Sequence, residues 1–97
     1  MKNNRIQFEQ YLKNVYRQDN GEPVKLKTVK DYSCLCNKAG EYLGMQKEYI
    51  FEITSPSIIK YYMPEIQQLS AARYQTPTTL IAPVKAYINF LQYKSEK

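Results

Sequence analysis

Residues 28–44 read TVKDYSCLCNKAGEYLG, and this stretch contains a start signal, an apolar stripe and a stop signal for one helix. Thr28 is a predicted N-cap, Asp31 follows where a carboxylate suits the positive end of the helix dipole, and Gly44 is the predicted stop. Five apolar residues between these signals recur at steps of three or four, so they share one helical face. They are Val29, Tyr32, Cys36, Ala39 and Leu43. We therefore expect an amphipathic helix that packs this face against the rest of the chain.

A first helix is predicted ahead of this stretch. Asn3 or Asn4 serves as its cap, and the helical pattern continues to about Gln18, before the turn residues DNGEP at 19–23. Its apolar stripe consists of Phe8, Tyr11, Leu12, Val15 and Tyr16. Beyond the central helix, residues 45–53 have no clear period. We interpret them as an extended connection, with or without a helical turn, that brings Ile50 and Ile53 into the core.

Two helices that contain proline follow. Ser55 and Pro56 predict the start of the third helix, because serine is a good cap and proline fits the first helical position. Pro64 interrupts this helix and predicts either a kink or a split into helices at 56–63 and 64–72. The last helix is predicted to open at residue 78 or 79 and to end near residue 93. Pro83 then lies within its first turn or so, where a missing N–H costs least.

Together these elements predict an all-α fold, a compact bundle of four to five helices. The chain has 97 residues, which is enough for one core but not for a second lobe, so residues 1–97 are predicted to form a single domain. A separate catalytic domain is absent from this chain. Because no acid/base pair or nucleophile set stands out, the chain by itself is not expected to be an enzyme.

The two cysteines, Cys34 and Cys36, predict neither a disulfide nor a metal site. Two residues apart on a helix, they point to nearly opposite sides and cannot bridge each other. The chain has no histidine to complete a zinc site, and we expect no metal and no cofactor. The sequence shows no signal peptide and no apolar run of about 18 residues, which predicts a cytoplasmic protein without a membrane partner.

The net charge of +5 is unevenly distributed along the chain. Basic residues dominate 1–18, 25–47 and 73–97, whereas acidic residues dominate 19–24 and 48–72. This alternation is typical of a dipolar protein whose basic face suits a polyanion. The alternative is that these charges form ordinary solvated surface.

The order of the helices and their short motifs resembles the SAM-like amino-terminal core-binding domain of phage integrases and other tyrosine recombinases. The matching motifs, which span about residues 5–93, are F-x-x-Y-L at 8–12, T-V-K-x-Y at 28–32, Y-L-G at 42–44, E-I-T-S-P at 52–56 and A-x-I-x-F-L at 86–91. The resemblance implies a domain that grips double-stranded DNA without cutting it. A catalytic recombinase domain elsewhere in the same gene product would then carry out DNA integration and recombination.

DNA phosphates are bound by cationic side chains and by free backbone N–H groups, and a helix start provides such N–H groups. In this chain basic residues lie near the predicted starts of the second and last helices. The predicted DNA-binding residues are Lys25, Lys27, Thr28, Lys30, Arg73, Thr76, Thr79 and Lys85. Most of them follow from the resemblance, since the second and last helices of this family face the DNA. Lys25 is included because it lies close to the predicted start of the second helix. Arg73 and Thr76 are included because they are close in sequence to the last helix. Thr28 has an alternative interpretation as a simple cap.

Two other functions are compatible with this sequence. Small helical domains of this kind also occur as DNA-binding attachments of nucleases and restriction proteins. A stand-alone protein-interaction module is the other alternative, because tyrosine is enriched at interfaces and Tyr49, Tyr61 and Tyr93 are expected to be exposed. In isolation the domain is expected to be a monomer.

Overall fold

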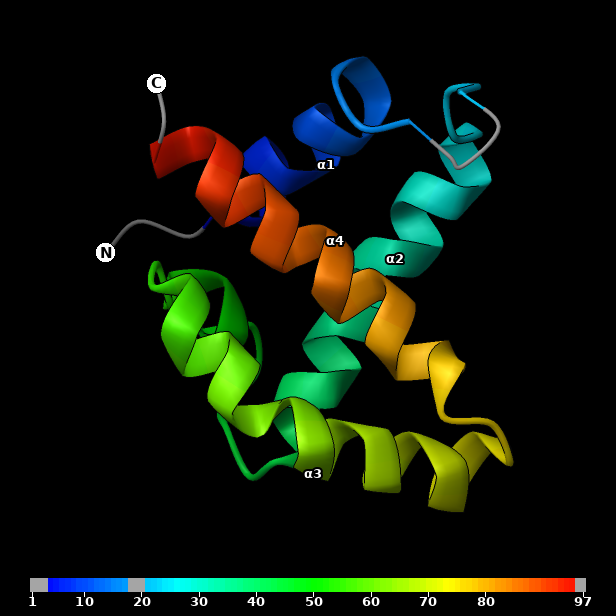
Figure 1. The fold of residues 1–97 in the computed structure, drawn as a ribbon, viewed down its shortest axis with the longest axis vertical. Helices are drawn as coiled ribbons and strands as arrows, with labels where there is room; N and C mark the ends of the chain where they lie inside the picture. The colour runs from blue at the N-terminus through cyan, green and yellow to red at the C-terminus, as the bar shows by residue number, and fades with distance from the viewer. Residues whose placement is uncertain (1–3, 18–20, 96–97) are drawn as a thin grey trace.

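The computed structural model describes residues 4–17 and 21–95 of the chain. Apart from one isolated β-bridge, all regular structure in these residues is helical. The elements are α1 (Arg5–Asn14), α2 (Leu26–Tyr42), the 3-10 helix η1 (Tyr49–Glu52), α3 (Pro56–Tyr74) and α4 (Thr78–Ser95). α4 packs against both α2 and α3, while α1 packs mainly against α2 (Figure 1). The predicted all-α bundle is confirmed.

α2 begins three residues earlier than predicted, because its N-cap is residue 25 instead of residue 28. Lys25 occupies the N-cap, and its carbonyl accepts the first intrahelical hydrogen bond at 3.0 Å. The prediction of Thr28 as the cap is therefore wrong. Leu26 and Lys27 are strong helix formers, and their propensity outweighs the cap preference of Thr28, which lies inside the first turn. Asp31 consequently falls in the second turn, and the first turn contains no acidic residue.

α2 ends at Tyr42, and Gly44 is the predicted stop residue just beyond this end. This glycine has a φ of +96°, in the left-handed region that glycine adopts at little cost. Its N–H donates to the carbonyl of Glu41 at 3.0 Å, and the N–H of Met45 donates to the carbonyl of Gly40 at 3.0 Å. These two hydrogen bonds form a Schellman motif, which pairs carbonyl groups that the helix end leaves without partners.

α1 is shorter than predicted, because it ends at Asn14. Asn4 occupies its N-cap position, whereas the alternative cap at residue 3 and the predicted end at residue 18 lie outside the described residues. Arg17 pairs with Pro23 in the isolated antiparallel bridge, so the chain has already left the helix and turned toward α2. Val15, which was expected on the apolar stripe, is exposed as a result.

α3 is one continuous helix, although it contains Pro64. Ser55 and Pro56 occupy the predicted N-cap and first helical positions, but the Ser55 side chain makes no capping hydrogen bond. Pro64 does not split the helix, because it is exposed and removes only one backbone donor. α4 extends to Ser95, beyond the predicted end, and Pro83 is its sixth residue, in the second turn instead of the first.

The core centres on Tyr87 of α4, which is fully buried. Its ring meets those of Phe8 and Phe51 edge to face, with centroids 5.2 Å and 5.5 Å away. The Tyr87 hydroxyl donates to the backbone carbonyl of Ile53 at 2.9 Å, and burial raises the pKa of Tyr87 well above its usual value. Ile50 and Ile53 are both buried, which confirms that the connection through η1 reaches the core.

The beginning of α1 and the end of α4 lie side by side (Figure 1). The Nζ of Lys94 donates to the Oδ1 of Asn4 at 3.0 Å, and the Lys94 ammonium also lies 5.9 Å from the centre of the Phe90 ring. The backbone N–H of Asn4 donates to the carbonyl of Phe51 at 3.0 Å. The first described residue is therefore tied both to the last helix and to η1.

Candidate nucleic-acid interface

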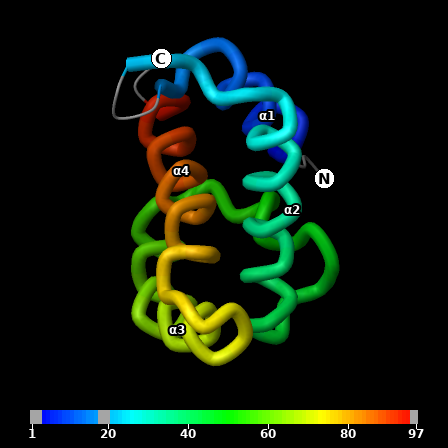
Figure 2. Tube along the Cα trace, turned by 90° about the vertical axis from the view of Figure 1, so that its right-hand side faces the viewer, coloured from blue at the N-terminus to red at the C-terminus, as the bar shows by residue number. Residues whose placement is uncertain are grey.

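The predicted DNA-binding residues do not form one surface. One group lies at the start of α2: Lys25, Lys27, Thr28 and Lys30. A second group lies at the joint between α3 and α4: Arg73, Thr76 and Thr79. Figures 1 and 2 place these two regions at opposite ends of the vertical axis, because α2 and α4 begin at opposite ends of the molecule. A ligand that contacts both helix starts must therefore extend along the molecule.

The start of α2 combines exposed cations with backbone N–H groups to which the N-cap side chain, that of Lys25, makes no hydrogen bond. Lys25, Lys27 and Lys30 are all exposed, and no acidic residue lies in the first turn. The partial positive charge of the helix dipole adds to the lysines at this end. Thr28 is half-buried and lies inside the first turn, not at the cap position. This end of α2 therefore has the properties of an anion-binding surface.

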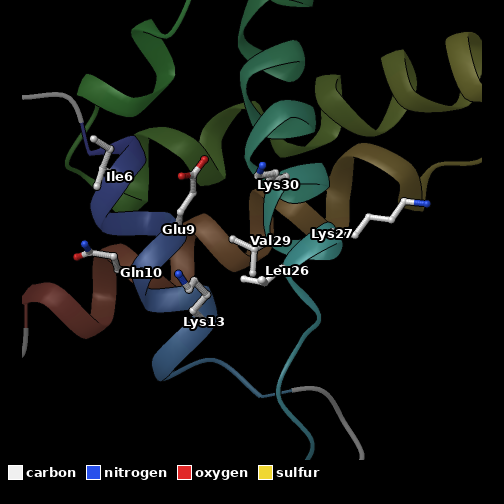
Figure 3. Close-up of a pocket in the computed structure, with 8 residues that line it drawn as sticks. All are labelled: Ile6, Glu9, Gln10, Lys13, Leu26, Lys27, Val29 and Lys30. Carbon is white, nitrogen blue, oxygen red and sulfur yellow. The ribbon is translucent and has the colours of Figure 1, made fainter.

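A groove of about 640 Å³ lies between α1 and α2, beside this helix start (Figure 3). The two helices run antiparallel, which brings Lys13 at the end of α1 next to Leu26 at the start of α2. Lys27 and Lys30 line the same groove from α2. Lys13 was not among the predicted site residues, since its position depends on how the two helices pair. With Lys25, it makes four lysines at or beside the start of α2.

Arg5 is a structural cation in this region. Its Nε donates to the Oγ of Ser33 at 2.7 Å and lies 3.6 Å from a carboxylate oxygen of Glu9. Its Nη1 donates to the carboxylate of Glu48 at 3.2 Å. Arg5 thus links α1 to α2 and to the residue before η1. Because Glu9 lines the groove and is paired with Arg5, its negative charge is partly neutralised within the chain.

The start of α4 differs from that of α2, because side chains of the chain itself cap its backbone. The buried Oγ of Ser70 accepts the N–H of Leu80 at 3.1 Å and donates to the carbonyl of Thr76 at 2.6 Å. The Oγ1 of Thr76 accepts the N–H of Thr78 at 3.3 Å. Two N–H groups at this helix start are therefore already paired within the chain. The sequence predicted free backbone N–H groups at the start of the last helix, but those of Thr78 and Leu80 are not free.

The remaining predicted cations lie apart from the start of α2. The guanidinium of Arg73 lies 3.9 Å from the centre of the Tyr42 ring, a close cation–π contact. The hydroxyls of Tyr42 and Tyr74 are 3.0 Å apart, and this hydrogen bond together with burial raises the pKa of Tyr74. Lys85 lies with Lys60 in a separate groove of about 240 Å³ between α3 and α4.

The cysteines are both free, and their surroundings differ. Cys36 is fully buried, and burial raises the pKa of its thiol well above the usual value. Cys34 is exposed, and the Nη2 of Arg5 lies 3.5 Å from its sulfur. Within residues 4–17 and 21–95, no three histidine, cysteine or acidic side chains are grouped so that they could hold a metal ion.

Comparisons with known proteins return no relative of this chain: no protein-family model, no curated protein and no solved structure matches it. The likeness to core-binding domains of recombinases therefore stays a prediction from the motifs. Among the described residues, no helix has the length and apolar character needed to cross a membrane.

Proposed function

We propose that this chain is a non-catalytic DNA-binding domain that contacts duplex DNA through the start of α2 and the adjoining end of α1. One observation carries the proposal: four lysines, Lys13, Lys25, Lys27 and Lys30, lie at or beside a helix start whose N-cap side chain makes no capping hydrogen bond. Lysine ammonium groups and free backbone N–H groups are the two kinds of donor that bind phosphate oxygens. The contact is therefore to the DNA backbone, which gives affinity without sequence preference.

The surroundings of these lysines favour a polyanion. Asp31 lies in the second turn of α2, and Glu9 is paired with Arg5, so neither opposes a phosphate at the first turn. The start of α4 is a weaker candidate for phosphate binding, because the side chains of Ser70 and Thr76 accept hydrogen bonds from two of its backbone N–H groups. The proposed contact surface is thus narrower than the sequence predicted. It keeps Lys25, Lys27 and Lys30, and adds Lys13.

The motifs support a more specific role in DNA integration and recombination. In that role the chain is the core-binding domain of an integrase-like tyrosine recombinase, acts in the cytoplasm and is monomeric off DNA. The strand-cutting chemistry belongs to a catalytic domain of the same gene product. A DNA-binding attachment of a nuclease or restriction protein would use the same surface, so both roles share one binding test.

The test is fluorescence anisotropy with a labelled random-sequence duplex of about 25 base pairs, at salt concentrations from about 0.05 to 0.2 M. The Lys27→Glu/Lys30→Glu variant should lose duplex binding while it keeps its helicity. The matched control is Lys47→Glu/Lys60→Glu, which changes the net charge equally at two exposed lysines away from the start of α2. Full binding by the first variant, or equal loss by both, would contradict the proposal.

A second candidate function is protein interaction through the exposed face of α3. The Tyr61 side chain is 80% exposed and Ile58 is 48% exposed, and the rings of Tyr61 and Tyr62 meet edge to face at 5.3 Å. Tyr93, by contrast, is half-buried and packs on Tyr11, with ring centroids 5.3 Å apart. Sedimentation velocity tests self-association: a dimer that Ile58→Ser/Tyr61→Ser converts to a monomer would favour this candidate.

A further inference from the structure

Two large apolar side chains stand exposed on the walls of the groove between α1 and α2. Ile6, in the first turn of α1, is 69% exposed, and Leu26, the first residue of α2, is 64% exposed. Val29 is buried between the two helices, and Figure 3 shows Val29 and Leu26 pointing toward α1. Exposed apolar groups that line one groove are typical of an interaction site. DNA phosphates would gain nothing from them.

The charged side chains around Ile6 and Leu26 are mainly positive. Lys13, Lys27 and Lys30 line the groove, while Glu9, an acidic residue of its lining, is paired with Arg5 at 3.6 Å. A complementary partner therefore carries apolar side chains on one stripe and carboxylates on both sides of that stripe. An amphipathic helix presents such a stripe at steps of three and four residues, and helices commonly bind in grooves between helices.

We propose that the α1–α2 groove binds an acidic amphipathic helix of a protein partner. Ile6 and Leu26 contact the apolar stripe of that helix, above the buried Val29, and the surrounding lysines pair with its carboxylates. The proposal goes beyond the proposed DNA contact, since it depends on apolar side chains that a phosphate backbone does not use. Because Lys27 and Lys30 take part in both, the acidic helix would compete with DNA for the start of α2.

The probe is a fluorescein-labelled helical peptide of about 18 residues, five turns, with leucine at i, i+3, i+4 and i+7 repeats and mainly glutamate elsewhere. A scrambled peptide of the same composition has the same charge but no apolar stripe. At near-physiological salt, the striped peptide should bind at least about tenfold more tightly than the scrambled one. Ile6→Ser/Leu26→Ser should remove this tenfold preference.

Ile58→Ser/Tyr61→Ser is the matched control, because it removes two exposed apolar side chains from α3 and should leave the preference intact. Thermal melting checks that each variant is folded. Absence of striped-peptide binding, equal binding of the scrambled peptide, or an unaffected preference in Ile6→Ser/Leu26→Ser would each overturn the proposal. Equal binding of the two peptides would point to a surface for polyanions alone, as in the DNA proposal.

Duplex binding by Ile6→Ser/Leu26→Ser separates the two proposals. We expect it to stay within about twofold of wild type, because all the lysines that contact phosphate are retained. If the wild type fails to bind DNA but binds the striped peptide, only the DNA proposal fails. If it binds DNA but shows no preference for the stripe, only the acidic-helix proposal fails.

Discussion

Replacing Ser70 with alanine should destabilise the domain by removing the internal cap of α4. The Ser70 hydroxyl is fully buried and forms two hydrogen bonds, 3.1 Å from the N–H of Leu80 and 2.6 Å from the carbonyl of Thr76. Alanine leaves both groups without this partner, but only the hydrogen bond to the N–H of Leu80 is buried, whereas the one to Thr76 is partly exposed. The cost of one unpaired buried polar group, about 1–3 kcal/mol, therefore applies. Alanine is also the better helix former, by about 0.5 kcal/mol, which offsets part of the loss. We expect a net loss of about 2 kcal/mol.

Urea unfolding followed by circular dichroism measures this loss, and thermal melting gives a second readout. For a domain of this size, about 2 kcal/mol corresponds to a fall in Tm of about 8–16 °C. Ser57→Ala is the control, because Ser57 lies on the same helix but is exposed, and it should change stability by less than about 0.5 kcal/mol. Equal effects of the two substitutions would refute the reasoning. The N–H groups at the start of α4 would then not depend on Ser70, and phosphate binding there would be a stronger candidate.

Further results are expected for Tyr87, for Gly44 and for the four lysines. Tyr87→Phe leaves the carbonyl of Ile53 without its partner and should cost about 1–2 kcal/mol in urea unfolding. Burial raises the pKa of Tyr87 above the usual tyrosine value of about 10, so the unfolded chain loses this proton first as pH rises. The free energy of unfolding should therefore fall above about pH 10, and it should fall less steeply in Tyr87→Phe. An unchanged dependence on pH in this variant would contradict the prediction. Gly44→Ala should cost about 1–2 kcal/mol, because residue 44 has a φ of +96°, and a neutral effect would show that the Schellman turn relaxes. If the four lysines contact phosphates, the logarithm of duplex affinity should fall with a slope of roughly −3.6 against the logarithm of salt concentration. Lys25→Gln should make this slope shallower by about 0.9, and an unchanged slope would remove Lys25 from the contact.

The sequence predicted those features of the fold that depend on local backbone preferences. Gly44 and the Ser55-Pro56 pair mark helix boundaries correctly, because positive φ and a missing N–H restrict where these residues fit. Thr28 misled the prediction because its cap preference competes with the helix propensity of the two residues before it. Continuity through Pro64 was not predictable, since it depends on that residue being exposed.

The candidate site was predictable only where its residues are neighbours in the sequence. The cluster at Lys25 and Lys27 is visible in the sequence because the lysines are neighbours. Lys13 and Ile6 belong to the groove only because α1 and α2 pair antiparallel, which no local pattern specifies. Two of the partners of Arg5, Ser33 and Glu48, lie 28 and 43 residues away, so the role of Arg5 in linking α1 to α2 and η1 could not be predicted from its neighbours in the sequence.

The contact between Asn4 and Lys94 also determines how this domain fits into a larger polypeptide. Because the start of α1 and the end of α4 lie together, segments joined at these two points would begin close to each other. The domain is thus suited to insertion into a surface loop of another protein, since the host's two cut ends need not be pulled apart. It is equally suited to circular permutation, with the original ends joined by a short linker and new ends opened between α3 and α4.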